Sequence, residues 1–71
     1  MIVSIAGQIS EVEREISMRR EVFPRQVQRR MMKESEAELK IAYMEAVLRT
    51  LRWLQQNEAA IKQRLAVTDH E

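Results

Sequence analysis

The longest uninterrupted pattern in the sequence is a helical one that runs from Glu34 to Leu65. Apolar residues recur there at intervals of mostly three or four, on one helix face: Ile41, Met44, Val47, Leu48, Leu51, Leu54, Ile61 and Leu65. The stretch contains no Gly or Pro, and most of its other residues lose little side-chain freedom in a helix. About 30 residues at roughly 1.5 Å each give a rod of about 45 Å. The remainder of a 71-residue chain can do little more than cover that rod, so the sequence predicts an all-α fold.

A second apolar seam precedes this stretch. Its members alternate between three and four residues apart, with one Arg among them: Ile2, Ile5, Ile9, Val12, Ile16, Arg19 and Phe23. The seam predicts a helix from about Ser4 to Val22. Pro24 lacks an N–H and disfavours helical geometry in the residue before it, so this helix is expected to stop or kink there. Since Pro suits the first position of a helix, residues 24–30 are predicted to form a short elbow helix.

Folding the two helices back on each other brings their seams into register, with Ile16 near Met44 and Ile9 near Leu51. The predicted architecture is an antiparallel helical hairpin with a short elbow helix, forming one domain over residues 1–67, with residues 68–71 as a disordered tail. A chain this short, without Cys, seldom builds an ample core alone. We therefore expect a homodimer in which two hairpins make a four-helix bundle. The predicted dimer interface comprises Trp53, Leu54, Ile61 and Leu65.

Arg19 is the one charged member of the first seam. A buried charge is costly unless a partner neutralises it. In the expected register Glu45 lies close to Arg19, and the two are predicted to form a structural ion pair. Glu15, four residues earlier on the same helix, is the competing partner.

Basic residues are concentrated in the middle of the chain, although the formal net charge is only +1. Residues 14–33 hold seven basic and two acidic side chains, an excess of +5. The candidate surface for a partner or for nucleic acid comprises Arg20, Arg25, Arg29, Arg30 and Lys33. Such a surface could contact phosphates, dock onto an acidic protein, or remain a solvated or ion-paired face.

The sequence offers little for catalysis. His70 is its only His, Gly7 its only Gly, and it has no Cys, so neither a nucleophilic triad nor a glycine-rich phosphate loop can be assembled. A non-enzymatic protein without metal or cofactor is predicted. No window approaches 18 apolar residues and the apolar start is too short for a signal peptide, which favours the cytoplasm over a membrane.

The segment from Glu15 to Val27 resembles a group of small phage- and prophage-encoded helical proteins of unknown function. They share the pattern Glu-x-x-Met-Arg-x-x-Val-aromatic-Pro-x-x-Val, followed by a loop and Ala-x-x-x-Ile-x-x-Met-Glu. The matching residues are Glu15, Met18, Arg19, Val22, Phe23, Pro24, Val27, Ala37, Ile41, Met44 and Glu45. The resemblance covers roughly residues 11–51. Where the group has Gly after the short helix and Ser or Thr capping the next, this chain has Arg30 and Lys33.

The resemblance implies a phage or prophage origin and an accessory role in the cytoplasm of a bacterial host. Together with the helical surfaces, it leads us to expect a non-enzymatic protein that binds a host or phage protein. The alternative is an accessory protein that binds nucleic acid through the basic region from Arg20 to Lys33.

Overall fold

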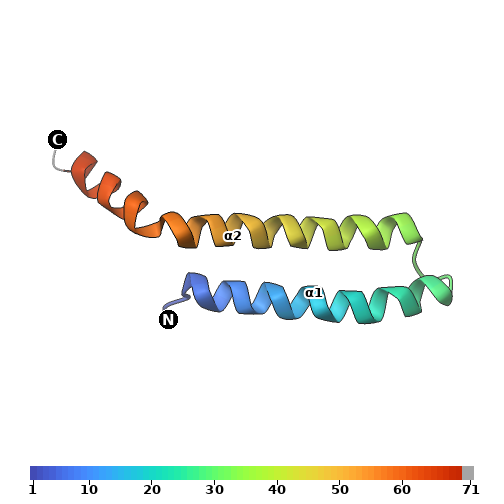
Figure 1. Ribbon diagram of the computed structural model, residues 1–71. Helices are drawn as coiled ribbons and strands as arrows, with labels where there is room; N and C mark the ends of the chain where they lie inside the picture. Colours follow the sequence, from blue (N-terminus) through green and yellow to red (C-terminus); the bar gives the residue numbers. More distant parts are fainter. Residues whose placement is uncertain (70–71) are drawn as a thin grey trace.

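The chain folds into two antiparallel helices that pack against each other along most of the shorter one (Figure 1). In this computed structural model residues 1–69 are described, with side chains described for residues 1–65. Helix α1 spans Ile5–Gln28 and α2 spans Glu34–Asp69, and residues 1–69 contain no strand. The molecule measures 58 × 23 × 18 Å, and its radius of gyration of 17.3 Å exceeds the roughly 11 Å typical of a compact domain of this length. The predicted all-α hairpin is confirmed.

Helix α1 begins where the apolar seam predicts. Ser4 is its N-cap: the hydroxyl accepts a hydrogen bond from the Gly7 N–H at 3.0 Å, and the Ser4 carbonyl accepts the Gln8 N–H at 3.0 Å. A Ser at this position satisfies one of the N–H groups that the first helical turn leaves without a partner. The cap explains why α1 starts within one residue of the predicted position.

The predicted end of this helix at Val22, and the separate elbow helix after it, are both wrong. Helix α1 continues through Pro24 to Gln28 as a single element. An interior Pro removes one backbone hydrogen bond and costs about 3 kcal/mol. Its neighbours Phe23 and Val27 are half-buried and line one hollow with Ala37 and Ile41 of α2, so their burial against α2 helps to offset that cost.

The elbow between the helices is closed by a Schellman motif. The Arg30 N–H donates to the Val27 carbonyl at 3.0 Å, and the Met31 N–H donates to the Gln26 carbonyl at 2.9 Å. This motif requires a left-handed residue just after the helix, and Arg30 fills that place with a φ of 61°. Gly is the usual residue there because it has no Cβ to clash. Arg30 therefore holds a strained backbone conformation.

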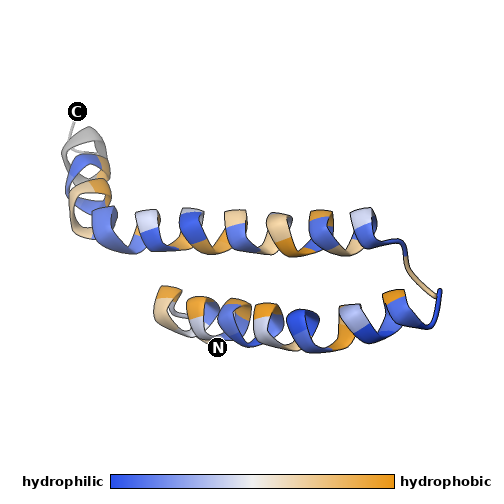
Figure 2. Cartoon of the chain, turned by 45° about the vertical axis from the view of Figure 1, so that its right-hand side comes forward, coloured by the Kyte–Doolittle hydropathy of each residue, from blue (hydrophilic) through white to orange (hydrophobic). Residues whose placement is uncertain are grey.

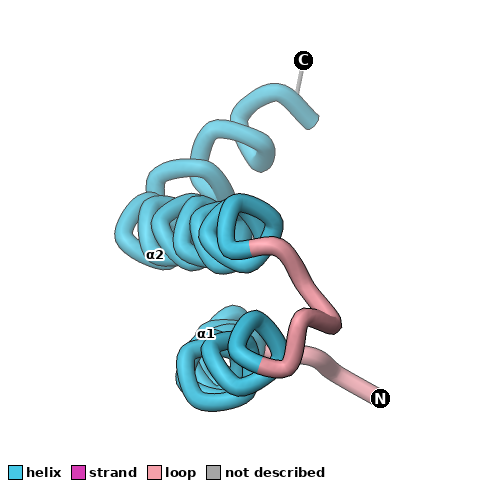
Figure 3. Tube along the Cα trace, turned by 90° about the vertical axis from the view of Figure 1, so that its right-hand side faces the viewer, coloured by secondary structure: helices cyan, strands magenta, loops and turns pink. Residues whose placement is uncertain are grey.

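Helix α2 begins at Glu34 and runs two residues past the predicted domain end at residue 67, to Asp69. The last two residues of the predicted tail lie outside the described residues. The orange and red C-terminal part of α2 turns away from α1, toward the opposite side of the helix (Figures 1 and 3). In this region the Asn57 side chain donates to the Trp53 carbonyl at 2.8 Å. Side chains that share a carbonyl of the helical ladder can bend a helix, although Thr50 makes the same kind of bond to Ala46 where α2 is straight.

The core is a single row of side chains between the helices. Hydrophobic stretches line the edge of α1 that faces α2 (Figure 2). Among the described side chains only Ile9, Ile16 and Ala37 are less than a tenth exposed. Most other seam residues are half-buried, and Ile2 at the start of the chain is 98% exposed, because a two-helix hairpin covers each helix from one side only. Two helices alone thus leave much apolar surface in contact with water.

Candidate interaction surfaces

The side of α2 that faces away from α1 carries a second apolar surface, which we call the far face. Its large members are strongly exposed: Leu39 (55%), Tyr43 (66%), Val47 (43%) and Trp53 (57%). Ala46, Thr50 and Leu54 fall on the same face by helical spacing. The residues of α2 that meet α1, such as Ala37, Ile41 and Leu48, lie on a different face.

Two polar side chains on the far face are hydrogen-bonded within α2. The Thr50 hydroxyl donates to the Ala46 carbonyl at 3.1 Å, and the Asn57 amide donates to the Trp53 carbonyl at 2.8 Å. Covering a polar group is costly when it loses its hydrogen bonds to water without replacement. These two donors keep their partners when the face is covered, whereas the Tyr43 hydroxyl and the Trp53 indole N–H need a partner or an edge position open to water.

The four residues of the predicted dimer interface are not equivalent in the structure. Trp53 and Leu65 are exposed by 57% and 59%, whereas Leu54 and Ile61 are half-buried. The bend separates them further, since Trp53 and Leu54 precede Asn57 while Ile61 and Leu65 follow it. Sequence periodicity placed Leu54, Ile61 and Leu65 along a straight helix, with Trp53 beside their stripe and Tyr43 and Val47 on its flank. It did not single out Leu39, although the four-residue spacing of Leu39, Tyr43 and Val47 is visible in the sequence.

Arg19 does not form the predicted ion pair with Glu45. Its Nε donates to the Glu15 carboxylate at 2.7 Å, and its Nη1 donates to the Lys40 carbonyl at 3.0 Å. The guanidinium also lies over the Phe23 ring, 5.8 Å from the centroid. Glu15, the competing partner, lies on the same helix as Arg19. Contact between them therefore does not depend on how the two helices are rotated relative to each other. The bond to Lys40 still ties Arg19 to α2.

Glu45 pairs instead with Arg20, whose Nη2 lies 2.9 Å from its carboxylate. A second cross-helix pair, Arg52 with Glu13 at 3.5 Å, lies on the same side of the hairpin. These four residues line a shallow groove with Arg49. Arg49 itself makes no side-chain hydrogen bond or ion pair within the described part of the chain. Sequence reasoning missed this charged flank, although the spacing of Arg49 and Arg52 could have indicated it.

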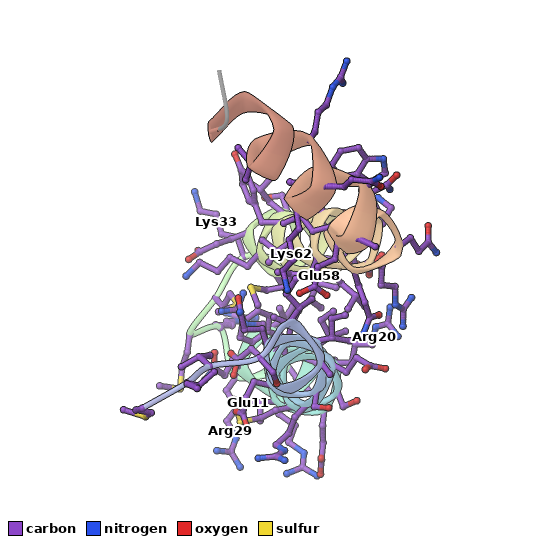
Figure 4. The ribbon with its side chains drawn as sticks, turned by 90° about the vertical axis from the view of Figure 1, so that its left-hand side faces the viewer. Glu11, Arg20, Arg29, Lys33, Glu58 and Lys62 are labelled. Carbon is purple, nitrogen blue, oxygen red and sulfur yellow. The ribbon has the colours of Figure 1, made fainter. Side chains whose placement is uncertain are left out.

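The structure divides the predicted basic surface. Arg20 and Arg25 are engaged with Glu45 and Glu21, at 2.9 and 3.5 Å. Figure 4 shows Arg20 on one side of the hairpin and Arg29 and Lys33 toward the other. Among the described residues, the side chains of Arg29, Arg30 and Lys33 form no hydrogen bond or ion pair. Within the predicted basic surface, the residues without a partner in the described chain are therefore those of the elbow.

No arrangement for metal chemistry is present in the described part of the chain. It holds no cluster of three or more His, Cys, Asp or Glu side chains suited to a metal ion. Across these residues every buried polar side-chain atom has a hydrogen-bond partner. Neither helix, over the same residues, is both long enough and apolar enough to cross a membrane.

No protein-family model, curated protein or solved structure matches this chain.

Proposed function

We propose that the chain is a non-enzymatic interaction protein that acts as a homodimer, in which the far faces of two α2 helices meet and the two hairpins form a four-helix bundle. The far face is the observation that supports this best. Four large apolar side chains stand exposed there on one helix. Burying a fully exposed side chain of this size contributes roughly 1.5–3 kcal/mol, and these four, exposed by 43–66%, would each contribute about half of that.

The total exposed area also supports self-association. The chain exposes 6214 Å² for a mass of 8.4 kDa. A compact monomer of this mass exposes about 4600 Å². The excess of about 1600 Å² is ample for one partner's share of a standard interface, which is about 800 Å². A second copy can therefore supply the apolar contact that the hairpin lacks.

A pair of matched variants tests the far face. Tyr43→Glu places a charge on it, whereas Gln56→Glu adds the same charge to an exposed position off it. We expect Tyr43→Glu to weaken the dimer at least tenfold in light scattering coupled to size exclusion, and Gln56→Glu to leave the dimer intact. Equal masses for the two variants at every concentration would contradict the proposal.

The dimer leaves the elbow free to bind a second protein, which we propose comes from the bacterial host or the phage. Met31 is 74% exposed at the elbow, next to the unengaged Arg29 and Arg30. An exposed apolar side chain flanked by basic groups suits an acidic protein surface. Wild-type protein and Met31→Glu are compared in capture from nuclease-treated bacterial lysate. A protein retained by the wild type and lost with the variant is expected; equal retention by both would contradict a role for the elbow.

Nucleic-acid binding is the second candidate, and the strained Arg30 favours it. Gly would avoid the strain at this position. We therefore take the Arg30 side chain to be needed at the elbow for binding. Arg29, Arg30 and Lys33 could together contact a phosphate backbone. Affinity for DNA and RNA is measured across a salt series. A steep fall with salt that is flattened by Arg29→Gln and Lys33→Gln would support this candidate, and no binding at low salt would exclude it.

A further inference from the structure

The structure also indicates how a second copy would lie on the far face. The start of α2 is acidic, with three Glu and one Lys over residues 33–38, whereas the only charged residues over positions 46–56 are Arg49 and Arg52. Two α2 helices packed parallel would place like charges side by side. Packed antiparallel, they bring the acidic start of each helix toward the Arg49–Arg52 segment of the other. Helix dipoles favour the same arrangement, because opposite ends then lie together.

The bend limits where the second helix can lie. The C-terminal part of α2 leans toward the side away from α1, which is the side of the far face (Figures 1 and 3). A helix lying along the far face must therefore contact the straight part, before Asn57. The large residues of this straight part run from Leu39 to Leu54, and the midpoint between them falls at Ala46 and Val47.

From these observations we propose that two copies pack antiparallel through the straight part of α2, with the two-fold axis passing close to Ala46 and Val47. This inference rests on the proposed homodimer and adds its geometry. Leu39 of each copy then lies opposite Leu54 of the other, and Tyr43 lies opposite Thr50. All of these positions belong to the far face. The small Ala46 at the crossing lets the two helices approach to the usual 8–10 Å separation, a general value for packed helices.

Cysteine cross-linking tests the geometry directly, because the chain contains no native Cys. Single variants Ala46→Cys, Leu39→Cys and Leu54→Cys are oxidised in dilute solution, with Gln56→Cys as the exposed control off the far face. We expect Ala46→Cys to form disulfide-linked dimers at least tenfold faster than Gln56→Cys. Leu39→Cys and Leu54→Cys should each link alone at the control rate, but an equimolar mixture of the two should link into mixed dimers.

Two outcomes would overturn this geometry while leaving the homodimer itself intact. Rapid linking of Leu39→Cys alone would indicate a parallel dimer, since identical residues away from the axis meet only in parallel packing. Control-level linking of Ala46→Cys in a protein that sediments as a dimer would place the contact elsewhere. A protein that sediments as a monomer would instead contradict the proposed homodimer, and the geometry with it.

Discussion

The Asn57 side chain donates a hydrogen bond of 2.8 Å to the carbonyl of Trp53, one helical turn before it, in the region where α2 turns away from α1. That carbonyl is the regular acceptor of the Asn57 backbone N–H. When two donors share one carbonyl, the backbone hydrogen bond of that helical turn is weakened. The bend beside this bond divides α2 into a straight part, which carries the far face, and a C-terminal part that leans toward that side.

Removing this bond should straighten α2. We predict that Asn57→Ala stabilises the helix by up to about 0.7 kcal/mol, because Ala is the better helix former. Spin labels at Glu11 and Gln63, diluted with unlabelled protein, report the angle as a distance between α1 and the C-terminal part. The distance should shift in Asn57→Ala and stay constant in the control Gln56→Ala. An unchanged distance in both would mean that another interaction causes the bend.

Glu15 should matter more to stability than Glu45. The Glu15–Arg19 pair is 34% and 25% exposed, whereas Glu45 and Arg20 are 39% and 61% exposed. Exposed ion pairs contribute at most about 1 kcal/mol, and often nothing measurable. Glu15→Ala should lower the free energy of unfolding by about 1–1.5 kcal/mol, because it leaves a half-buried guanidinium with one partner fewer. Urea denaturation of both variants measures the order; a larger loss in Glu45→Ala would contradict the pairing described above.

Ile16 is the most buried residue among those whose side chains are described, at 5% exposure. Ile16→Ala should cost about 2–4 kcal/mol, through lost burial and the cavity left between the helices. Met18, two residues later, is 51% exposed, and Met18→Ala should change stability by no more than about 0.5 kcal/mol. Thermal or urea unfolding of the two variants checks the difference. Similar losses would mean that α1 meets α2 through another face.

Replacing Arg30 should stabilise the hairpin. Its φ of 61° costs an L-residue about 1–2 kcal/mol, and Gly avoids most of this cost. We expect Arg30→Gly to raise the free energy of unfolding by about 1 kcal/mol. Arg29→Gly is the matched control, because it removes the same charge one residue earlier, where φ is −84° and Gly brings no relief. The elbow geometry would be contradicted if the control were stabilised equally.

The sequence predicted what depends on periodicity along one helix. The alternation of three- and four-residue spacings between apolar residues was sufficient to predict both helices and the burial of Ile9 and Ile16. It could not weigh the local cost of Pro24 against packing of Phe23 and Val27 on α2, which is a tertiary effect. It also could not choose between Glu15 and Glu45 for Arg19. That choice depends on the relative rotation of two helices, which spacing within each helix does not define.

The same reasoning applies to the candidate surfaces. The far face could be identified only once the side of α2 that α1 covers was known, and periodicity along the helix does not indicate the bend near Asn57. The basic cluster was predicted as one surface. In the structure Arg20 and Arg25 form ion pairs. The elbow residues Arg29, Arg30 and Lys33 form no side-chain hydrogen bond or ion pair within the described chain.

Sedimentation equilibrium of the wild-type protein tests the proposed self-association most directly. At micromolar concentration the chain should sediment with twice its mass of 8.4 kDa and dissociate on dilution. Its melting temperature should rise with concentration, since dimerisation stabilises the folded state by mass action. A helical protein that sediments at 8.4 kDa and melts at the same temperature at every concentration would contradict the homodimer and leave the far face without its proposed partner.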